Sequence, residues 1–209
     1  MKTLASMALL AAIAVGNASV LNFDDLDAAG QGGAYLIGSS YDGFNISGDL
    51  GVMTNSYYNN GFANSATFPS APNAAYNGYG ETEIDFTLQN TTANGKANGN
   101  LSTFGFGGLD ASFWAEQDSS ASFSSQSITV EGWLNGNIVG SSSMILGASF
   151  AHLNGFAGQI DTLKIKNDGN TTWWVIDNLS TDAAVPEPTS MAALGLGVAA
   201  LLRRRAKKA

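Results

Sequence analysis

The stretch Glu81-Thr82-Glu83-Ile84-Asp85-Phe86-Thr87-Leu88 alternates strictly, so that every second side chain belongs to the same set. One set runs from Thr82 through Ile84 and Phe86 to Leu88, and the other contains carboxylates. A period of two is the pattern of a β-strand that buries one face and exposes the other. The carboxylates of Glu81, Glu83 and Asp85 are therefore expected on an outer, solvated surface rather than in a catalytic pair.

A β-hairpin is predicted further along the chain. The stretch from Ser127 to Leu134 alternates in the same way. Asn135-Gly136 follows, a dipeptide that strongly favours a two-residue hairpin turn, and Ile138-Val139 begins the return strand.

Two more strands are predicted nearer the C-terminus. Leu163 and Ile165 share one face of the first strand. The second, from Thr171 to Leu179, is apolar on both faces, which is typical of a strand inside a sheet. Its faces carry Trp174 and Ile176 on one side, and Trp173, Val175 and Leu179 on the other. About eight to ten strands of this kind, separated by turns, predict an all-β fold, an antiparallel jelly-roll-like β-sandwich.

Residues 55–80 depart from the strand pattern, because Asn, Tyr, Ala, Gly and Pro dominate there. A long loop, or a loop with one short strand, is predicted. Long loops in compact domains often carry function.

Charge is distributed unevenly along the 209 residues. Between residues 19 and 185, three lysines, no arginine and sixteen acidic residues give a net charge of −13. Such a surface repels nucleic acid and anionic lipid, and it suits calcium, neutral glycans or simple solubility. The chain has no cysteine, so this body must be held together by packing, with or without a metal.

The N-terminus has the three parts of a secretory signal peptide. Lys2 supplies the positive charge, Leu4 to Val15 are apolar, and Gly16-Asn17-Ala18 places small residues where a signal peptidase cuts. We expect a signal helix in residues 1–18 and cleavage after Ala18. A buried N-terminal helix is the alternative.

The C-terminus also has three parts. Pro186, Glu187 and Pro188 are followed by the apolar run from Met191 to Leu202, and then by Arg203, Arg204 and Arg205. As a helix the run would span about 18 Å, against a hydrocarbon core about 30 Å thick, so it predicts a minimal transmembrane helix. The basic residues hold that end in the cytoplasm and leave the body outside.

This arrangement of residues 185–209 resembles the PEP-CTERM sorting signal of Gram-negative bacteria. The resemblance implies recognition by an exosortase, a membrane-embedded, cysteine transpeptidase-like enzyme that would cut near Pro186-Glu187-Pro188. The inner membrane would then hold the protein only transiently, before it reaches the cell surface or the extracellular matrix. A permanent tail anchor is the alternative.

Short motifs of the body resemble one recurrent PEP-CTERM body type. They are Asn22-Phe23-Asp24-Asp25-Leu26, Tyr41-Asp42-Gly43-Phe44, Pro72 to Gly78, Ser127 to Trp133 with Asn135-Gly136, and Val175-Ile176-Asp177-Asn178-Leu179. That body is similar to the jelly-roll sandwiches of carbohydrate-binding modules. The resemblance implies one β-sandwich domain, residues 19–184, more firmly than it implies an activity.

Asp24, Asp25 and Asp177 form a candidate metal site. Asp177 lies in an otherwise apolar strand, and a buried carboxylate needs a partner that a body without arginine cannot provide as an ion pair. Calcium takes oxygen ligands, and the resemblance to binding modules with a structural calcium near this place implies the same ion. The alternative is hydrogen bonding, with Asp177 accepting from backbone amides and Asp24-Asp25 forming turns.

Aromatic side chains form a second candidate site, because rings stack on the faces of sugars. The candidates are Tyr57, Tyr58, Tyr76 and Tyr79 in the Asn-rich loop, and Trp114 and Trp133 on or beside strands. The alternative is that these rings fill the core or fix the loop. Trp173 and Trp174 point to opposite faces, so one of them is expected outside the core.

The usual catalytic residue sets are missing from the sequence. His152 is the only histidine, which excludes a multi-histidine zinc site, and there is no thiol nucleophile. No Gly-x-Ser-x-Gly elbow is present to raise a serine for His152. We expect a non-catalytic surface or extracellular-matrix protein associated with biofilm exopolysaccharide. The alternatives are a glycan-binding module with a structural calcium and, third, a glycoside hydrolase.

Overall fold

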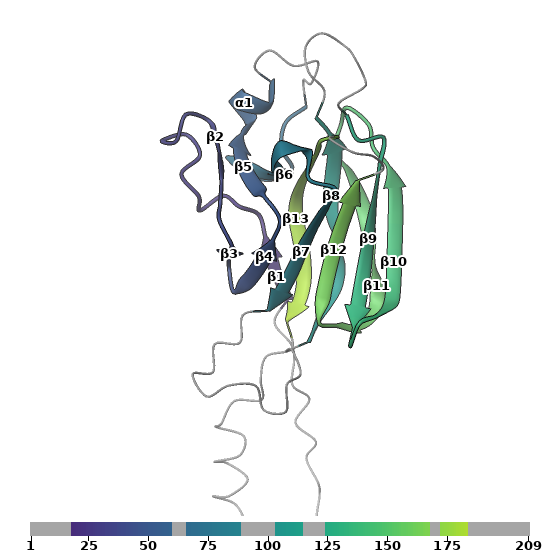
Figure 1. Cartoon of the computed structure of the whole chain (residues 1–209). Helices are drawn as coiled ribbons and strands as arrows, with labels where there is room; N and C mark the ends of the chain where they lie inside the picture. Colours follow the sequence, from purple (N-terminus) through teal and green to yellow (C-terminus); the bar gives the residue numbers. More distant parts are fainter. Residues whose placement is uncertain (1–17, 60–65, 89–102, 115–123, 168–171, 184–209) are drawn as a thin grey trace, which may run out of the picture. The chain divides into compact units, whose positions relative to one another are not determined.

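Two antiparallel β-sheets lie face to face and form a sandwich (Figure 1). The computed structural model describes residues 18–59, 66–88, 103–114, 124–167 and 172–183. These belong to one compact unit, Ala18–Ala184. The predicted signal helix and transmembrane helix lie outside the described residues, and within those residues no helix is long and apolar enough to cross a bilayer. The predicted all-β antiparallel sandwich is confirmed.

The first sheet has seven strands in the described part of the chain. Their order is β11 (Ala151–Ile160), β8 (Phe104–Phe113), β13 (Trp174–Ala183), β6 (Asn73–Asn77), β5 (Leu50–Thr54) and β2 (Ala34–Leu36), and β1 (Ala18–Leu21) also pairs with β13. The last strand is therefore central. It pairs with β8 along one side, and with β6 and then β1 along the other. This confirms the interior position predicted from its two apolar faces.

The second sheet has six strands in the same described ranges. Their order is β10 (Asn137–Ile145), β9 (Ser127–Leu134), β12 (Thr162–Asn167), β7 (Glu83–Leu88), β4 (Phe44–Ser47) and β3 (Ser40–Tyr41). The predicted hairpin is present between β9 and β10. Asn135 and Gly136 have φ values of 52° and 78°, the positive values that a type I′ turn requires.

The core lies between the facing sides of the two sheets. Ile84 and Phe86 of β7 are fully buried there, as the alternation predicts. Phe104 and Trp174 from the first sheet belong to the same cluster. Each fully buried side chain of this kind contributes about 1.5–3 kcal/mol. Packing of the two faces therefore holds together a body that has no disulfide.

Strand β13 reverses the facing of its side chains near Asn178. Its register with β8 shifts between Asp177 and Ser180, and Asn178 has a φ of 50°. Such a bulge adds one residue and moves the following side chain to the other face. Leu179 therefore joins the core with Trp174, which corrects the prediction that it shares a face with Val175.

The region 55–80 is not simply a loop. It begins with a short helix, α1 (Asn55–Asn59), in which the hydroxyl of Thr54 caps the first turn by accepting a hydrogen bond from the Tyr57 amide at 3.2 Å. Tyr58 is fully buried and forms a second apolar cluster with Met53, Phe68, Ala74 and Val175. The helix forms because this cluster covers its apolar side. The composition of residues 55–80 alone does not show that this cluster packs against the helix.

Candidate functional site: an aromatic pocket

A pocket with a volume of about 380 Å³ opens beside β2 and β6. None of the described residues lining it is charged, and most are aromatic: Ala34, Tyr35, Leu36, Tyr76, Gly78, Tyr79, Trp114 and Trp173. We call it the aromatic pocket. Its volume falls in the range of roughly 300–1,000 Å³ that small-molecule sites occupy.

The pocket walls are held by contacts between rings. Trp114, directly after β8, packs edge-on against Tyr76 of β6, with 5.4 Å between ring centroids. It also packs edge-on against Trp173, directly before β13, at 6.4 Å. Edge-to-face pairs at these distances are favourable beyond the area they bury. The pairs fix the relative orientation of rings from three segments that are far apart in sequence.

Tyr79 is presented to solvent by a strained turn. The 3-10 turn η1 (Gly78–Gly80) follows β6 directly, and Tyr79 within it has a φ of 53° and is 74 % exposed. A bulky residue with positive φ costs stability and persists only where its surroundings hold it. Gly78 is needed beside it, because a Cβ there would collide with the Leu36 side chain and the carbonyl oxygen of Asp49. An exposed ring held in a strained turn beside a pocket is typical of a binding site.

Asn77 holds the turn against β13. Its side chain is fully buried, and its amide nitrogen donates hydrogen bonds to the carbonyl oxygens of Glu81 and Thr172, each at 2.8 Å. Its side-chain oxygen accepts one from the Trp174 amide, also at 2.8 Å. One side chain thus ties together the two chain segments that carry Tyr79 and Trp173. Sequence reasoning did not identify this residue, because an Asn at a strand end is also typical of an ordinary turn.

Two tyrosines that line the pocket, Tyr35 and Tyr76, have raised pKa values. Burial raises the pKa of Tyr76 to about 12, and the nearby Tyr57 and Tyr79 add to the shift. Burial also raises the pKa of Tyr35, with Asp27 and Asp25 contributing. Their hydroxyl groups therefore keep their protons and can donate hydrogen bonds.

The structure brings three of the six predicted aromatic residues together, because Tyr76, Tyr79 and Trp114 all line the pocket. Tyr57 lies next to it, with its ring 6.1 Å from that of Trp114. Tyr58 does not reach the surface, since it is fully buried and its hydroxyl lies 2.9 Å from that of Ser112. This corrects its assignment as a glycan-binding residue: its ring serves the second apolar cluster.

Two lining aromatics, Tyr35 and Trp173, were not among the predicted site residues. The adjacent Trp173-Trp174 pair indicated in part that one of them lies outside the core, because only one of the two could face it. Trp174 is fully buried and Trp173 lines the pocket. Tyr35 gave no signal, since its place in the pocket depends on the pairing of β2 with β5.

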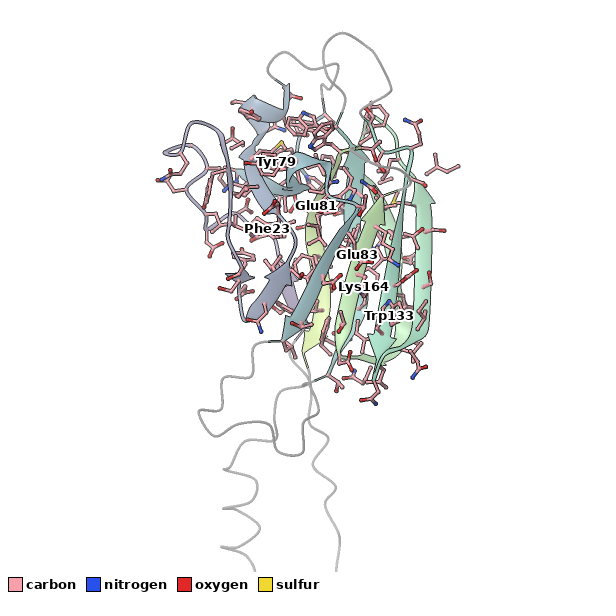
Figure 2. The ribbon with its side chains drawn as sticks, viewed as in Figure 1. Phe23, Tyr79, Glu81, Glu83, Trp133 and Lys164 are labelled. Carbon is pink, nitrogen blue, oxygen red and sulfur yellow. The ribbon has the colours of Figure 1, made fainter. Side chains whose placement is uncertain are left out.

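The sixth residue, Trp133, lies elsewhere, on the outer face of the second sheet (Figure 2). Its indole nitrogen donates a hydrogen bond to Glu131 at 3.0 Å. The amines of Lys164 and Lys166 lie 5.5 Å and 5.9 Å from its ring centroid, within cation–π range. The Trp133 ring thus contacts two lysines. It belongs to a charged network and not to the aromatic pocket.

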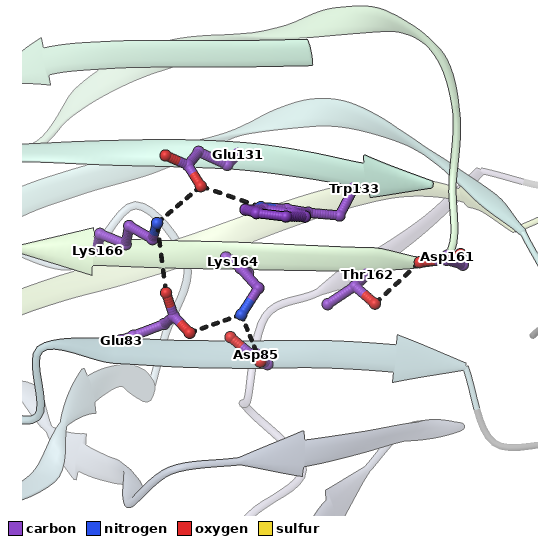
Figure 3. Close-up of polar contacts among 8 residues, drawn as sticks. All are labelled: Glu83, Asp85, Glu131, Trp133, Asp161, Thr162, Lys164 and Lys166. Atoms are coloured by element: carbon purple, nitrogen blue, oxygen red, sulfur yellow. Dashed lines mark hydrogen bonds and ion pairs between the residues drawn. The ribbon is translucent and has the colours of Figure 1, made fainter. Parts of the chain in front are cut away.

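That network contains two of the three carboxylates predicted on this outer face, Glu83 and Asp85 of β7 (Figure 3). Lys164 pairs with Glu83 at 2.6 Å and with Asp85 at 3.0 Å, and Lys166 pairs with Glu131 at 2.7 Å. Burial opposes ionisation of Glu83, but the two lysines outweigh it and lower its pKa. Burial is the larger effect at Asp85 and raises its pKa. The pattern is that of carboxylates balanced by lysines on a sheet surface.

The three predicted calcium ligands have hydrogen-bond partners of their own. The fully buried Asp177 carboxylate accepts hydrogen bonds from the amide and hydroxyl of Ser70, at 2.7 Å and 2.9 Å, and from the Asn178 amide at 2.7 Å. Asp24 accepts one from the Asn73 amide, and Asp25 accepts one from the Tyr41 hydroxyl.

These contacts agree with the hydrogen-bonding interpretation of the acidic residues. Among the described residues, no group of three or more acidic, histidine or cysteine side chains is arranged to hold a metal ion. Asp24 does act electrostatically on Asp177, because its charge helps to raise the pKa of Asp177. The calcium site itself stays a prediction.

His152 lies on β11 at the surface. Its Nδ1 is 2.9 Å from Asp110 of β8, whose other carboxylate oxygen accepts a hydrogen bond from the Asn178 side chain at 2.9 Å. These contacts link three neighbouring strands of the first sheet and include no serine hydroxyl. They account for the histidine as a surface residue in a polar cluster.

Comparison with known proteins bears on the C-terminus. Residues 184–206 match the model of the PEP-CTERM protein-sorting motif. The chain carries a PEP-CTERM motif. The match includes Pro186, Glu187, Pro188 and the three arginines 203–205, all predicted as parts of the signal. The motif implies an exported protein that an exosortase sorts. None of the curated proteins matches the chain.

Proposed function

We propose that this protein is a non-catalytic component of the cell surface or extracellular matrix that binds neutral polysaccharide in its aromatic pocket. The observation that carries the proposal is an uncharged, aromatic lining next to the exposed ring of Tyr79. No carboxylate is among the described residues lining this pocket, whereas glycoside hydrolysis uses a pair of them. The pocket chemistry therefore supports binding without cleavage.

A neutral pyranose suits this pocket. Its C–H faces pack on aromatic rings, and its hydroxyl groups form hydrogen bonds with protonated tyrosines such as Tyr35 and Tyr76. A polyanionic glycan would approach a body with a net charge of −13 and be repelled. The charge of the body thus favours neutral polysaccharide over acidic polysaccharide.

The PEP-CTERM motif supports the proposed location. Signal peptidase would remove residues 1–18, and exosortase would cut near Pro186-Glu187-Pro188. Because β1 begins at Ala18, cleavage after that residue would leave Ser19 to Leu21 in the strand. The body would then reach the exopolysaccharide outside a Gram-negative cell.

A binding assay tests the pocket. The full chain, in mild non-ionic detergent, is mixed with a panel of insoluble neutral polysaccharides, and the protein left in solution is measured. Tyr79→Ala removes an exposed ring without opening the core, and we expect it to weaken binding about tenfold, the equivalent of about 1.4 kcal/mol. Trp133→Phe is the matched control on the other sheet and should bind as the unchanged chain does. Absence of depletion by every polysaccharide, or equal binding by Tyr79→Ala, would contradict the proposal.

A structural calcium at Asp24, Asp25 and Asp177 is a separate proposal. Its support is the buried carboxylate of Asp177 and the charge of Asp24 close enough to raise the pKa of Asp177. Calcium would offset both the burial of the Asp177 charge and its repulsion by Asp24, since calcium takes carboxylate and carbonyl oxygens as ligands. A chelator should then lower the melting temperature of the unchanged chain but not that of Asp177→Ala. An unchanged melting temperature with chelator would reject the site.

A further inference from the structure

The two sides of the sandwich end in different kinds of edge strand. On one side the sheets end in β2 and β3, which are three and two residues long. On the other side they end in β10 and β11, which are nine and ten residues long. Very short edge strands are one way in which proteins prevent unwanted strand pairing. The β10 and β11 side lacks that protection.

Strand β10 also lacks two other usual protections of an edge. It contains no charged residue and no proline, although the body as a whole is strongly acidic. Each of the two edge strands has one register shift and one regular part. Strand β10 pairs with β9 in unbroken register from Ser141 to Ile145, after a shift between Ile138 and Gly140. Strand β11 pairs with β8 in unbroken register from Ala151 to Phe156, before a shift between Phe156 and Ile160. Within the described chain, β10 pairs with β9 alone. Ser141–Ile145 is therefore a regular edge segment without a titratable side chain, whereas the regular segment of β11 contains His152.

Exposed apolar side chains are concentrated on the same strand. Ile138, Val139 and Ile145 are 53 %, 47 % and 85 % exposed, and they are three of the seven large apolar or aromatic side chains exposed in the described residues. Ile145 extends from the outer face of the regular half, next to the small exposed residues Ser141 and Ser143. Exposed apolar side chains on a flat edge favour pairing with another strand.

We propose that β10 is a self-association edge, at which Ser141–Ile145 pairs antiparallel with the same segment of a second copy of the chain. Two identical antiparallel strands are related by a two-fold axis, which makes the contact closed and self-complementary. With the axis at Ser143, Ile145 lies across from Ser141 of the copy, and Met144 lies across from Ser142. Each large side chain thus meets a small one. The sheet of six strands would continue into the sheet of the partner.

Charge explains why a second copy would pair here rather than elsewhere. Two bodies that each carry a net charge of −13 repel one another over most of their surfaces. The β10 edge brings no carboxylate of its own into the contact. Backbone hydrogen bonds along Ser141–Ile145 would supply the attraction, as in other contacts formed by adding a strand to a sheet edge. The contact does not depend on the aromatic pocket.

Cysteine cross-linking tests the contact and its register, because the chain has no cysteine of its own. Ser143→Cys, in the full chain in mild non-ionic detergent, should form a disulfide-linked dimer under mild oxidation, since directly opposed residues bring their Cβ atoms within about 4.5–5.5 Å. Ser141→Cys and Ile145→Cys should each cross-link poorly alone and well when mixed. Ser40→Cys on the short edge strand β3 is the matched control and should stay monomeric. Equal cross-linking of Ser143→Cys and Ser40→Cys would overturn the proposal.

Sedimentation of cysteine-free chains gives an independent readout. The unchanged chain should show a monomer–dimer equilibrium, and Ile145→Lys, which places a charge on the edge, should shift the dissociation constant at least tenfold toward monomer. Val20→Lys is the matched control, because Val20 is also exposed, at 51 %, but lies on β1. A chain that stays monomeric at all concentrations, or one in which both variants behave alike, would refute self-association through β10.

Discussion

In calcium-free buffer, protonation of Asp177 is expected to stabilise the body at mildly acidic pH. Burial raises the pKa of this carboxyl group from 3.8 to about 6, and the charge of Asp24 adds to the shift. Between these two values the native state therefore binds more protons than the unfolded chain. The free energy of unfolding must then fall as the pH rises through about 6.

The size of the effect follows from the shift. Raising a pKa from 3.8 to about 6 corresponds to about 3 kcal/mol, because each pKa unit is worth about 1.4 kcal/mol. This stabilisation is complete below pH 3.8 and lost above about pH 6. The hydroxyl of Ser70 lies 2.9 Å from the carboxylate and can accept the added proton's hydrogen bond.

Urea unfolding followed by tryptophan fluorescence measures the effect. The full chain and Asp177→Asn are compared in calcium-free buffer at several pH values from about 3 to 7.5, and the difference between their free energies of unfolding is plotted. Because the amide does not titrate, this difference isolates Asp177 from the other carboxyl groups. As the pH rises, we expect the free energy of unfolding of the unchanged chain to fall by about 3 kcal/mol relative to that of Asp177→Asn. Two parallel curves would refute the reasoning.

Three further substitutions separate the pocket, the core and the charged network. Gly78→Ala should abolish polysaccharide binding and cost at least about 1 kcal/mol, because the new Cβ collides with Leu36; preserved binding would contradict the role given to the turn. Ile84→Ala should cost about 2–5 kcal/mol in urea unfolding, and a cost below about 1 kcal/mol would show that β7 does not line a tight core. Glu131→Gln should change stability by less than about 1 kcal/mol, since its pair with Lys166 is partly exposed, and it should leave binding unchanged in the depletion assay.

Alternation and turn chemistry made much of the sandwich predictable. Ser127–Leu134 was placed with its observed bounds, because every second side chain is apolar and Asn135-Gly136 ends the strand. The reversal at Asn178 was not predictable, since it depends on how β13 pairs with β8 on one side and β1 on the other. The alternation of apolar and polar residues along a strand indicates which side chains can be buried. The pairing of that strand with its neighbours decides which face of the sheet they lie on.

The site was predictable only in part for the same reason. Tyr76 and Tyr79 lie close together in sequence, so their shared location could be inferred from one aromatic segment. Trp114 and Trp173 reach the pocket from the ends of two other strands, and Asn77 fixes their segments through hydrogen bonds over long sequence separations. No local pattern contains that information, because the pocket is a product of topology.

The pairing of β1 with β13 also sets the order of events during export. Ala18 pairs with Asp182, so the first strand of the body is completed by the last. A chain that crosses a membrane N-terminus first presents β1 long before β13, and strand β13 is also the link between β6 and β8. Closing such a long loop is slow, and the first sheet cannot form around its centre until the final strand has emerged. In an export that begins at the N-terminus, as the predicted signal peptide implies, the body would complete its first sheet only after the residues just before the sorting tail have crossed.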